Sequence, residues 1–249
     1  MKDKTSYTLL GSGLTFAGAM LSYSSHFILR STPLTALGIS TLILGVVSLA
    51  LGRSQPKISP EATAILLESS LENVSAIIEE LGLKSKAVYL PSSMTSGQPQ
   101  ALIPLHLNPN PPNPKTPLPK RLVVKYGPNP EDLGLLITTP GSTVMSMLGS
   151  KPGSSPADIE SALSSVVTGT MDLADSVKVT VSGERIVVEV SNPRLEQRDI
   201  WVYKCLGSPL ASIVASATAE ALGEPVIIDN EWYEKGKSII ELKVLRQEL

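Results

Sequence analysis

The chain of 249 residues is poor in the side chains that most often carry out chemistry. It has one cysteine, Cys205, and two histidines, His26 and His106. A single cysteine excludes an intrachain disulfide. His26 lies in the apolar N-terminal region, and Cys205 and His106 alone cannot supply the three or four ligands of a Cys/His zinc site. Neither a Gly-x-Ser-x-Gly elbow nor a phosphate-binding Gly-x4-Gly-Lys-Ser/Thr loop occurs. We therefore assign no catalytic residue, cofactor or metal, although a site made of carboxylates alone stays open.

Charged side chains are missing from two long stretches near the N-terminus. Residues 5–29 and 31–52 contain no Asp, Glu, Lys or Arg. Each stretch exceeds the roughly 20 apolar residues that cross the hydrocarbon of a bilayer. We predict two transmembrane spans, at about 8–29 and 33–51, that form a helical hairpin within residues 1–55. A cleaved signal peptide is the alternative for the first span, but its apolar part is longer than such a peptide needs.

Basic residues are concentrated in the N-terminal part of the chain. Residues 1–59 hold five Lys or Arg and one Asp, whereas residues 60–249 hold the other 16 basic residues against 22 acidic ones. The acidic part has no dense basic run, so we expect no nucleic-acid partner. Basic residues favour the cytoplasmic side of a membrane. Since four of the five flank the outer ends of the hairpin, we predict that both termini and the soluble domain are cytoplasmic.

Small residues line one face of the first predicted span. Gly11, Gly18 and Ser22 share this face with Ser25. Small faces let transmembrane helices approach closely. The face therefore packs against the second span of the same chain, or it mediates homo-oligomerisation or docking to another membrane protein.

Residues 56–249 predict one α+β domain with an antiparallel sheet and helices on one face. Three Ser-Pro pairs, at residues 59, 155 and 208, are typical of helix N-termini. The first of these helices, residues 60–82, has an apolar stripe with heptad spacing: Leu67, Leu71, Val74, Ile78 and Leu81. The stripe lasts about two heptads, so docking on the chain's own sheet and a dimer seam are both open. A proline-rich loop, residues 108–119, cannot pair in a sheet and is either a stiff connection or a ligand for an aromatic groove.

Two segments of the domain resemble each other in the order of their elements. Residues 156–191 and 208–245 each predict one helix followed by a β-hairpin. At an offset of 47 residues the two helices share four identities, Ser161/Ser208, Leu163/Leu210, Ser165/Ser212 and Val167/Val214. We expect two α-β-β units that share one sheet, with a cleft between them as the natural place for a small ligand.

Three clusters are candidate contact residues. Trp201 and Tyr203 fall on one face with Cys205 if residues 198–205 form a strand, and this face either packs in the core or forms a ligand or partner surface. Trp232 and Tyr233 are predicted in the loop of the second hairpin, where exposed aromatic residues suit a partner or a ligand. The turn Gly141, Ser142 and Thr143 lies between a predicted strand and helix, where backbone N–H groups either bind an anion or are capped internally.

The C-terminal part of the chain carries a family resemblance. The residues are Gly169-Thr-Met-Asp-Leu-Ala-Asp-Ser-Val177, Gly207-Ser-Pro-Leu-Ala-Ser212 and Ala219-Glu-Ala-Leu-Gly-Glu-Pro-Val226. With the paired N-terminal spans, this pattern resembles uncharacterised archaeal membrane proteins that have a cytoplasmic α+β domain. The resemblance covers most of residues 155–249 and implies no activity or site.

Taken together, the sequence predicts a non-catalytic protein of the cell membrane, a tethered interaction or assembly module. Its partners would be the bilayer, through residues 8–51, and a second copy or another membrane protein. A small-molecule or lipid-binding module is the first alternative, and an enzyme with a carboxylate-based site is the second.

Overall fold

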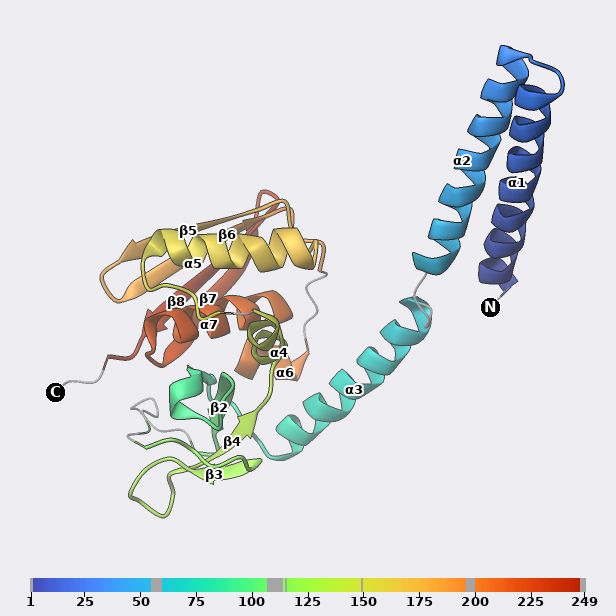
Figure 1. Cartoon of the computed structure of the whole chain (residues 1–249). Helices are drawn as coiled ribbons and strands as arrows, with labels where there is room; N and C mark the ends of the chain where they lie inside the picture. Colours follow the sequence, from blue (N-terminus) through green and yellow to red (C-terminus); the bar gives the residue numbers. More distant parts are fainter. Residues whose placement is uncertain are drawn as a thin grey trace. The chain divides into compact units, whose positions relative to one another are not determined.

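A computed structural model of the chain describes residues 2–54, 60–106, 114, 116–148, 150–195 and 200–246. The chain divides into two compact units, Met1–Glu68 and Ser69–Leu249 (Figure 1). The first unit contains helices α1 (Lys2–Phe27) and α2 (Thr32–Ser54). Helix α3 (Pro60–Glu80) starts in the first unit and continues into the second.

Helices α1 and α2 form an antiparallel hairpin whose seam is made of the smallest residues. A Cβ placed on Gly18 would lie 2.4 Å from the backbone nitrogen of Leu42, and one on Gly45 would lie 2.4 Å from that of Thr15. No side chain fits at these positions without separating the helices. Over residues 7–53, the buried positions recur every seven residues on each helix: Gly11, Gly18, Ser25, Gly38, Gly45 and Gly52.

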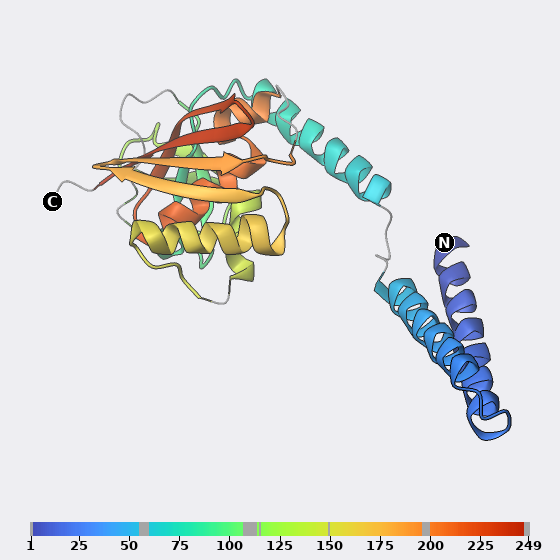
Figure 2. The ribbon, with the colours of Figure 1, turned by 90° about the horizontal axis from the view of Figure 1, so that it is seen from above.

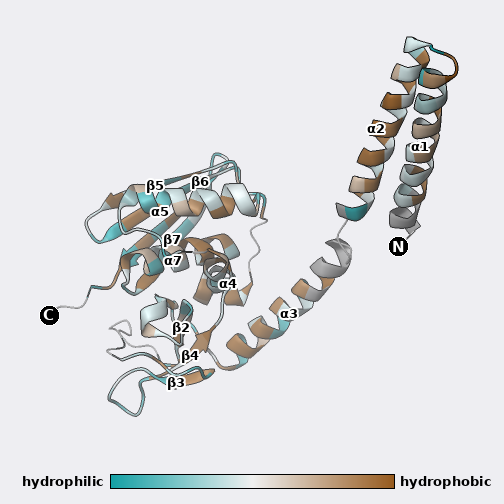
Figure 3. Cartoon of the chain, in the orientation of Figure 1, coloured by the Kyte–Doolittle hydropathy of each residue, from teal (hydrophilic) through white to brown (hydrophobic). Residues whose placement is uncertain are grey.

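Large apolar side chains of the hairpin point away from this seam. A coiled coil in water does the opposite, because its large apolar side chains fill the seam and its polar residues face the solvent. Figure 3 shows that apolar residues recur along α2. The exposed set includes Leu9, Leu10, Phe16, Met20, Leu37, Ile39, Ile43, Leu44, Val46, Val47 and Leu51.

Two described segments are long and apolar enough to cross a bilayer by length and composition. Thr32–Arg53 has a mean hydropathy of 2.2 and is 11% buried, whereas Trp201–Leu222 has a mean hydropathy of 1.3 and is 78% buried. The second segment belongs to the core of the domain. Helix α1 does not pass the same test, because its many Gly and Ser residues lower its hydropathy. The predicted span 33–51 is therefore better supported than the predicted span 8–29.

Helix α3 ends in a glycine cap and buries only part of its predicted apolar stripe. Gly82 has φ +64°, and the N–H of Leu83 donates to the carbonyl of Ile78, as in a Schellman motif. Ile78 and Leu83 belong to the main core. Leu67, Val74 and Leu81 are exposed, so the prediction that the stripe docks on the chain's own domain holds only at Ile78 and partly at Leu71. The predicted cap Ser59 lies outside the described residues.

In the part of the chain that the structure describes, eight strands form one antiparallel sheet in the order β3-β4-β2-β1-β7-β8-β6-β5. The fold class α+β and the antiparallel sheet are thus confirmed. The two predicted β-hairpins are present as β5-β6 and β7-β8. The bounds of the strands are β1 (Val88–Leu90), β2 (Gln100–Pro104), β3 (Val123–Lys125), β4 (Leu133–Ile137), β5 (Ser176–Ser182), β6 (Arg185–Ser191), β7 (Val226–Glu234) and β8 (Lys237–Val244).

The last part of the domain has the predicted order of two α-β-β units. Helix α5 (Pro156–Leu163) continues as π-helical turns (Ser164–Thr170) and leads into the hairpin β5-β6, while α7 (Pro209–Leu222) leads into the hairpin β7-β8. Strands β6 and β8 pair, which joins the two hairpins into one sheet. Figure 2 shows α5 against one face of these strands. Both helices begin as the sequence predicts, since Ser155 and Ser208 accept a hydrogen bond from the third residue of their helix.

Helix α7 is the centre of the domain and is buried on all sides. Its residues from Leu210 to Ala221 are all buried, and most of them are Ala, Ser or Thr. These small side chains let helix α4 (Pro140–Met147) come very close. A Cβ on Gly141 would lie 2.3 Å from the carbonyl oxygen of Ser212 and 2.3 Å from the hydroxyl of Ser216. An all-round apolar helix in a soluble domain is a core helix.

A smaller cluster covers the opposite face of the sheet beneath β1, β2 and β4. Leu118 packs there, and its N–H donates to the carbonyl of Met94. The end of the proline-rich loop is therefore anchored on the sheet. Residues 107–113 and 115 of that region lie outside the described residues, so the predicted polyproline tract is largely untested.

Candidate functional site

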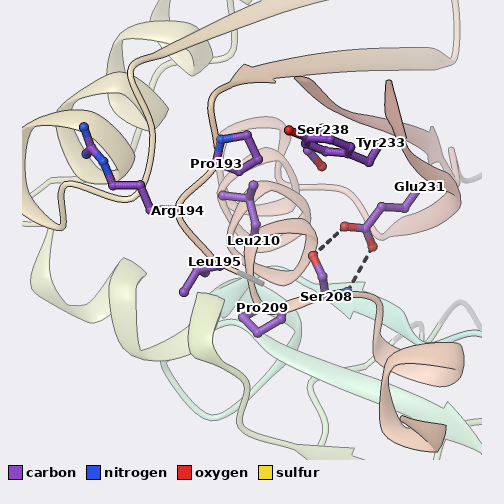
Figure 4. Close-up of a pocket in the computed structure, with 9 residues that line it drawn as sticks. All are labelled: Pro193, Arg194, Leu195, Ser208, Pro209, Leu210, Glu231, Tyr233 and Ser238. Atoms are coloured by element: carbon purple, nitrogen blue, oxygen red, sulfur yellow. Dashed lines mark hydrogen bonds between the residues drawn. The ribbon is translucent and has the colours of Figure 1, made fainter. Parts of the chain in front are cut away.

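A pocket of about 270 Å³ lies beside the N-terminus of α7 (Figure 4). It is placed where the chain that leaves the first α-β-β unit passes the start of the second. One wall comes from the loop after β6, and the others come from α7, β7 and β8. The lining residues are Pro193, Arg194, Leu195, Ser208, Pro209, Leu210, Glu231, Tyr233 and Ser238.

A β-bulge in β7 turns Glu231 and Tyr233 toward this pocket. The pairing of β7 with β8 shifts between Ile228 and Asn230, so one extra residue enters β7 and the alternation of its side chains reverses. After the bulge, Glu231 lies opposite Ile240 and Tyr233 lies opposite Ser238. Directly opposed residues share a face of the sheet, and Ile240 belongs to the main core. The bulge therefore brings a carboxylate and a phenol to the helix-covered face.

Glu231 caps the N-terminus of α7 together with Ser208. The Ser208 N–H donates to one carboxylate oxygen of Glu231 at 3.0 Å, and the Ser208 hydroxyl donates to the other. The same hydroxyl accepts the N–H of Ala211 at 3.1 Å. A carboxylate is favoured here because the start of a helix carries partial positive charge. Figure 4 shows the Glu231 carboxylate on Ser208 at the side of the pocket.

Most of the remaining lining apart from Ser238 is apolar, and the charge of the one cation in it is neutralised by two carboxylates. Pro193, Leu195, Pro209 and Leu210 supply aliphatic surface, and Tyr233 is 54% exposed. The guanidinium of Arg194 pairs with the carboxylates of Asp172 and Asp175, and Figure 4 shows it pointing away from the cavity. The lining thus offers small apolar surfaces, one phenol ring and one helix-bound carboxylate.

Below the N-terminus of α7, the polar groups are buried and internally satisfied. The hydroxyl of Tyr89 donates to the carbonyl of Leu206, and burial raises the pKa of this phenol far above its ordinary value. The thiol of Cys205 donates to the carbonyl of Leu83, and burial raises its pKa as well. A buried thiol of raised pKa is a poor nucleophile.

The segment around Trp201 and Tyr203 is helical, and the strand predicted there is wrong. Helix α6 (Trp201–Leu206) replaces it, so Trp201 and Cys205 come together at helical spacing. The indole N–H of Trp201 donates to the carbonyl of Leu83 at 2.9 Å, and both aromatic residues pack against the main core. The aromatic and branched residues of this segment favour a strand by β-propensity, but they also fit a short buried helix.

The predicted placement of Trp232 and Tyr233 in a loop is also wrong. Both lie within β7, and the turn of this hairpin is at Lys235 and Gly236, where φ is +49° and +79°. Because neighbouring strand residues face opposite sides of a sheet, Trp232 lies opposite Ile239, away from the pocket. Of the four aromatic candidates, the structure brings only Tyr233 into the pocket.

The turn Gly141, Ser142 and Thr143 starts α4, and its N–H groups have partners inside the protein. The N–H of Gly141 donates to the hydroxyl of Ser212 at 3.4 Å, the N–H of Ser142 donates to the hydroxyl of Thr139, and the N–H of Thr143 donates to the carbonyl of Thr139. Thr139 and Ser142 form a reciprocal capping box. Of the two interpretations of this turn, the structure favours internal capping over an anion site.

The predicted packing face Gly11, Gly18 and Ser22 contacts α2 of the same chain. A Cβ on Gly11 would lie 2.8 Å from the Leu49 nitrogen, and Ser22 occupies the space beside Gly38. This face is therefore used within the hairpin. A second copy or another membrane protein would therefore have to contact a different surface of the hairpin.

Within the described ranges, no group of three or more His, Cys, Asp or Glu residues is arranged to hold a metal ion. Asp172 and Asp175 are exposed and pair with Arg194. His26 and His106 are exposed and belong to different units.

The comparisons with known proteins give a family and no activity. Neither the curated proteins nor the solved structures contain a match to this chain. A family model described as a domain of unknown function, DUF7982, matches residues 2–243. The match covers the hairpin as well as the α+β domain, and the chain belongs to the DUF7982 family.

Proposed function

We propose that this protein is a membrane-tethered binding module without catalytic activity. Its hairpin spans the bilayer, and its α+β domain binds a partner on the cytoplasmic side through the pocket at the N-terminus of α7. The observation that carries the tether is the inverted packing of the hairpin, with glycine inside and large apolar side chains outside.

The energetics of this packing favour lipid over water. Each large apolar side chain left in water costs about 1.5–3 kcal/mol relative to burial, and the hairpin exposes many of them. Hydrocarbon removes that cost, and association of the two helices then depends on close backbone contact. The glycine seam at Gly11, Gly18, Gly38, Gly45 and Gly52 supplies such contact.

The distribution of basic residues supports a cytoplasmic domain. Arg30 alone lies at the turn between α1 and α2, and the other four basic residues of this region flank the opposite ends. The positive-inside rule then places the turn outside and both termini inside.

The pocket supports binding of a small group rather than of a lipid chain or a large substrate. Its volume of about 270 Å³ is below the 300–1,000 Å³ that is typical of sites for drug-sized ligands. The charged group at its side is the Glu231 carboxylate, which Ser208 at the N-terminus of α7 holds in place. A partner side chain that combines an apolar stem with a hydrogen-bond donor or a positive charge matches these walls.

Membrane insertion is tested on the full chain by alkaline extraction of isolated membranes, followed by protease treatment of inside-out and right-side-out vesicles. We expect the chain in the extracted pellet, with the domain digested only in inside-out vesicles. A full-length, unprocessed chain in the supernatant would refute the tether, and digestion only in right-side-out vesicles would refute the orientation.

Binding is tested by affinity purification from gently solubilised membranes, with mass spectrometry of proteins and small molecules. The matched variants are Tyr233→Ser in the pocket and Tyr7→Ser outside it. We expect a copurifying molecule that is lost with Tyr233→Ser and kept with Tyr7→Ser. A wild-type preparation free of any partner or ligand would contradict the proposal.

A further inference from the structure

Helix α3 carries an exposed apolar ridge that the domain does not cover. Leu67, Val74, Ile77 and Leu81 are 61%, 38%, 57% and 54% exposed, although Ile78 beside them is fully buried. The ridge residues follow one another at spacings of seven, three and four, with Ser70 completing the heptad pattern between Leu67 and Val74. Ser75 and Ile78 lie on the side of α3 that contacts the domain, where the Ser75 hydroxyl accepts the N–H of Val202.

We propose that this ridge is the seam of a parallel homodimer, in which α3 of one chain pairs with α3 of a second copy. With Leu67 at position a, the core positions are Leu67, Ser70, Val74, Ile77 and Leu81. The dimer uses a different surface from the pocket, and the parallel orientation of its two α3 helices rests on the proposed membrane tether.

Charge argues for a second copy over the membrane surface as the occupant. Residues 60–80 contain five Glu and no Lys or Arg. Helices that lie on a membrane carry Lys and Arg on their polar face, and an anionic leaflet repels carboxylates.

The carboxylates are placed so that they do not oppose one another across the proposed seam. Glu68 falls at position b, and Glu72 and Glu79 fall at position f, on the outer sides of the pair. In a parallel coiled coil, side chains at g face side chains at e of the partner. Asn73 at g would face Ile78, and Glu80 would face a position beyond the helix end, so no like charges meet.

The tether sets the direction of pairing and raises its strength. Only residues 55–59 separate the end of α2 from the start of α3, so two hairpins inserted in the same orientation begin both α3 helices near the same membrane surface, which favours parallel pairing. A seam of about two heptads is marginal for free molecules. Confinement of both copies to one bilayer restricts them to a thin layer and raises their effective concentration, so a weak seam can still pair.

The test is oxidative cross-linking of the full chain in membranes. Ser70→Cys places a thiol at a core position, and Glu72→Cys places one on the outer side of the same turn. The native Cys205 is buried and serves as the background in both variants. We expect Ser70→Cys to give a disulfide-linked species of twice the chain mass, with at least tenfold less from Glu72→Cys. Adding Ile77→Glu to Ser70→Cys should abolish the cross-link, because it puts two carboxylates into the seam.

Equal cross-linking of the two cysteine variants, or none from Ser70→Cys, overturns the dimer. A cross-link to a different protein in place of the doubled chain does so as well. Alkaline extraction of the same samples separates this failure from failure of the tether, since a chain that stays in the membrane pellet without cross-linking contradicts only the dimer.

Discussion

Gly141 lies where a side chain has no room. Its position at the α4–α7 contact would bring a Cβ to 2.3 Å from backbone and side-chain atoms of α7. We expect Gly141→Ala to lower the free energy of unfolding of the domain by about 3 kcal/mol, as overpacking of a rigid contact does. Tryptophan fluorescence during denaturation of detergent-solubilised protein measures it, since Trp201 and Trp232 both lie in the domain. Gly169→Ala is the control, because its Cβ would approach no atom closer than 3.9 Å; equal losses would contradict the packing argument.

The ion pair of Glu189 and Lys237 makes a small contribution to the free energy of unfolding, and this contribution is lost in acid. Lys237 Nζ lies 2.9 Å from a Glu189 carboxylate oxygen, and this partner lowers the pKa of Glu189. A lowered folded-state pKa stabilises the protein above the unfolded pKa of 4.5, and the contribution is lost as pH falls through the folded-state pKa. Because both side chains are more than a third exposed, we expect Lys237→Gln to cost only about 0.3 kcal/mol at pH 7 and nothing at the acid end. NMR titration should show the Glu189 pKa rising toward 4.5 in this variant. An unchanged pKa would show that Lys237 does not stabilise the Glu189 carboxylate.

At the scale of single elements, the glycine seam sets how close α1 and α2 lie. Gly18→Leu would force a side chain into the backbone of α2 near Leu42. We expect the two helices to move apart by about 2 Å or more, toward the ordinary 8–10 Å separation of packed helices. Spin labels on the exposed positions Phe16 and Leu44 report this distance in reconstituted protein. Gly13→Leu is the matched control because a Cβ there meets nothing within 4 Å; a shift of equal size in both variants would contradict the seam.

The start of α7 differs from the start of α5 although both are Ser-Pro caps. The Ser155 hydroxyl donates to the exposed carboxylate of Asp158 in its own first turn, while the Ser208 hydroxyl donates to the partly buried carboxylate of Glu231 on a distant strand. We expect Ser155→Ala to cost about 1 kcal/mol, the ordinary value of an N-cap. Ser208→Ala should cost about 2 kcal/mol, because the carboxylate that loses its hydroxyl donor is partly buried, whereas water can solvate the exposed Asp158. Chemical denaturation of the two variants side by side measures the difference, and equal costs would show that Glu231 adds nothing to this cap.

At the scale of the whole molecule, the hairpin and the domain are separate compact units. We expect a chain that begins at Pro60 to stay in the supernatant after high-speed centrifugation, while the full chain sediments with membranes. The fluorescence-detected melting temperature of the domain should change by less than about 4 °C, which corresponds to roughly 1 kcal/mol for a domain of this size. A truncated chain that aggregates or fails to unfold cooperatively would show that the domain needs the hairpin to fold.

The pocket depends on contacts between distant segments, whereas the helix caps and the order of the elements depend on local sequence. The caps Ser155 and Ser208 and the order of the two α-β-β units follow from local patterns, because caps, periodicity and turn residues act over a few positions. Trp201 was misassigned to a strand, and Tyr233 to a loop, because both outcomes depend on packing between distant segments. No sequence signal marks the bulge beside Asp229 that brings Glu231 to Ser208. A search for acidic residues a short distance after a Ser-Pro helix would have found Glu231 only among several others.

What the sequence by itself determined is the division into an N-terminal pair of helices with long uncharged stretches and an α+β domain, since hydropathy and periodicity are local properties of the chain. Only the tertiary structure decided which faces are used. It directed Gly11 and Gly18 inward against α2, placed α7 in the core, left Leu67, Val74, Ile77 and Leu81 uncovered, and assembled the pocket from three distant segments. Burial depends on which surfaces meet in space, and neither composition nor spacing along the chain specifies that meeting.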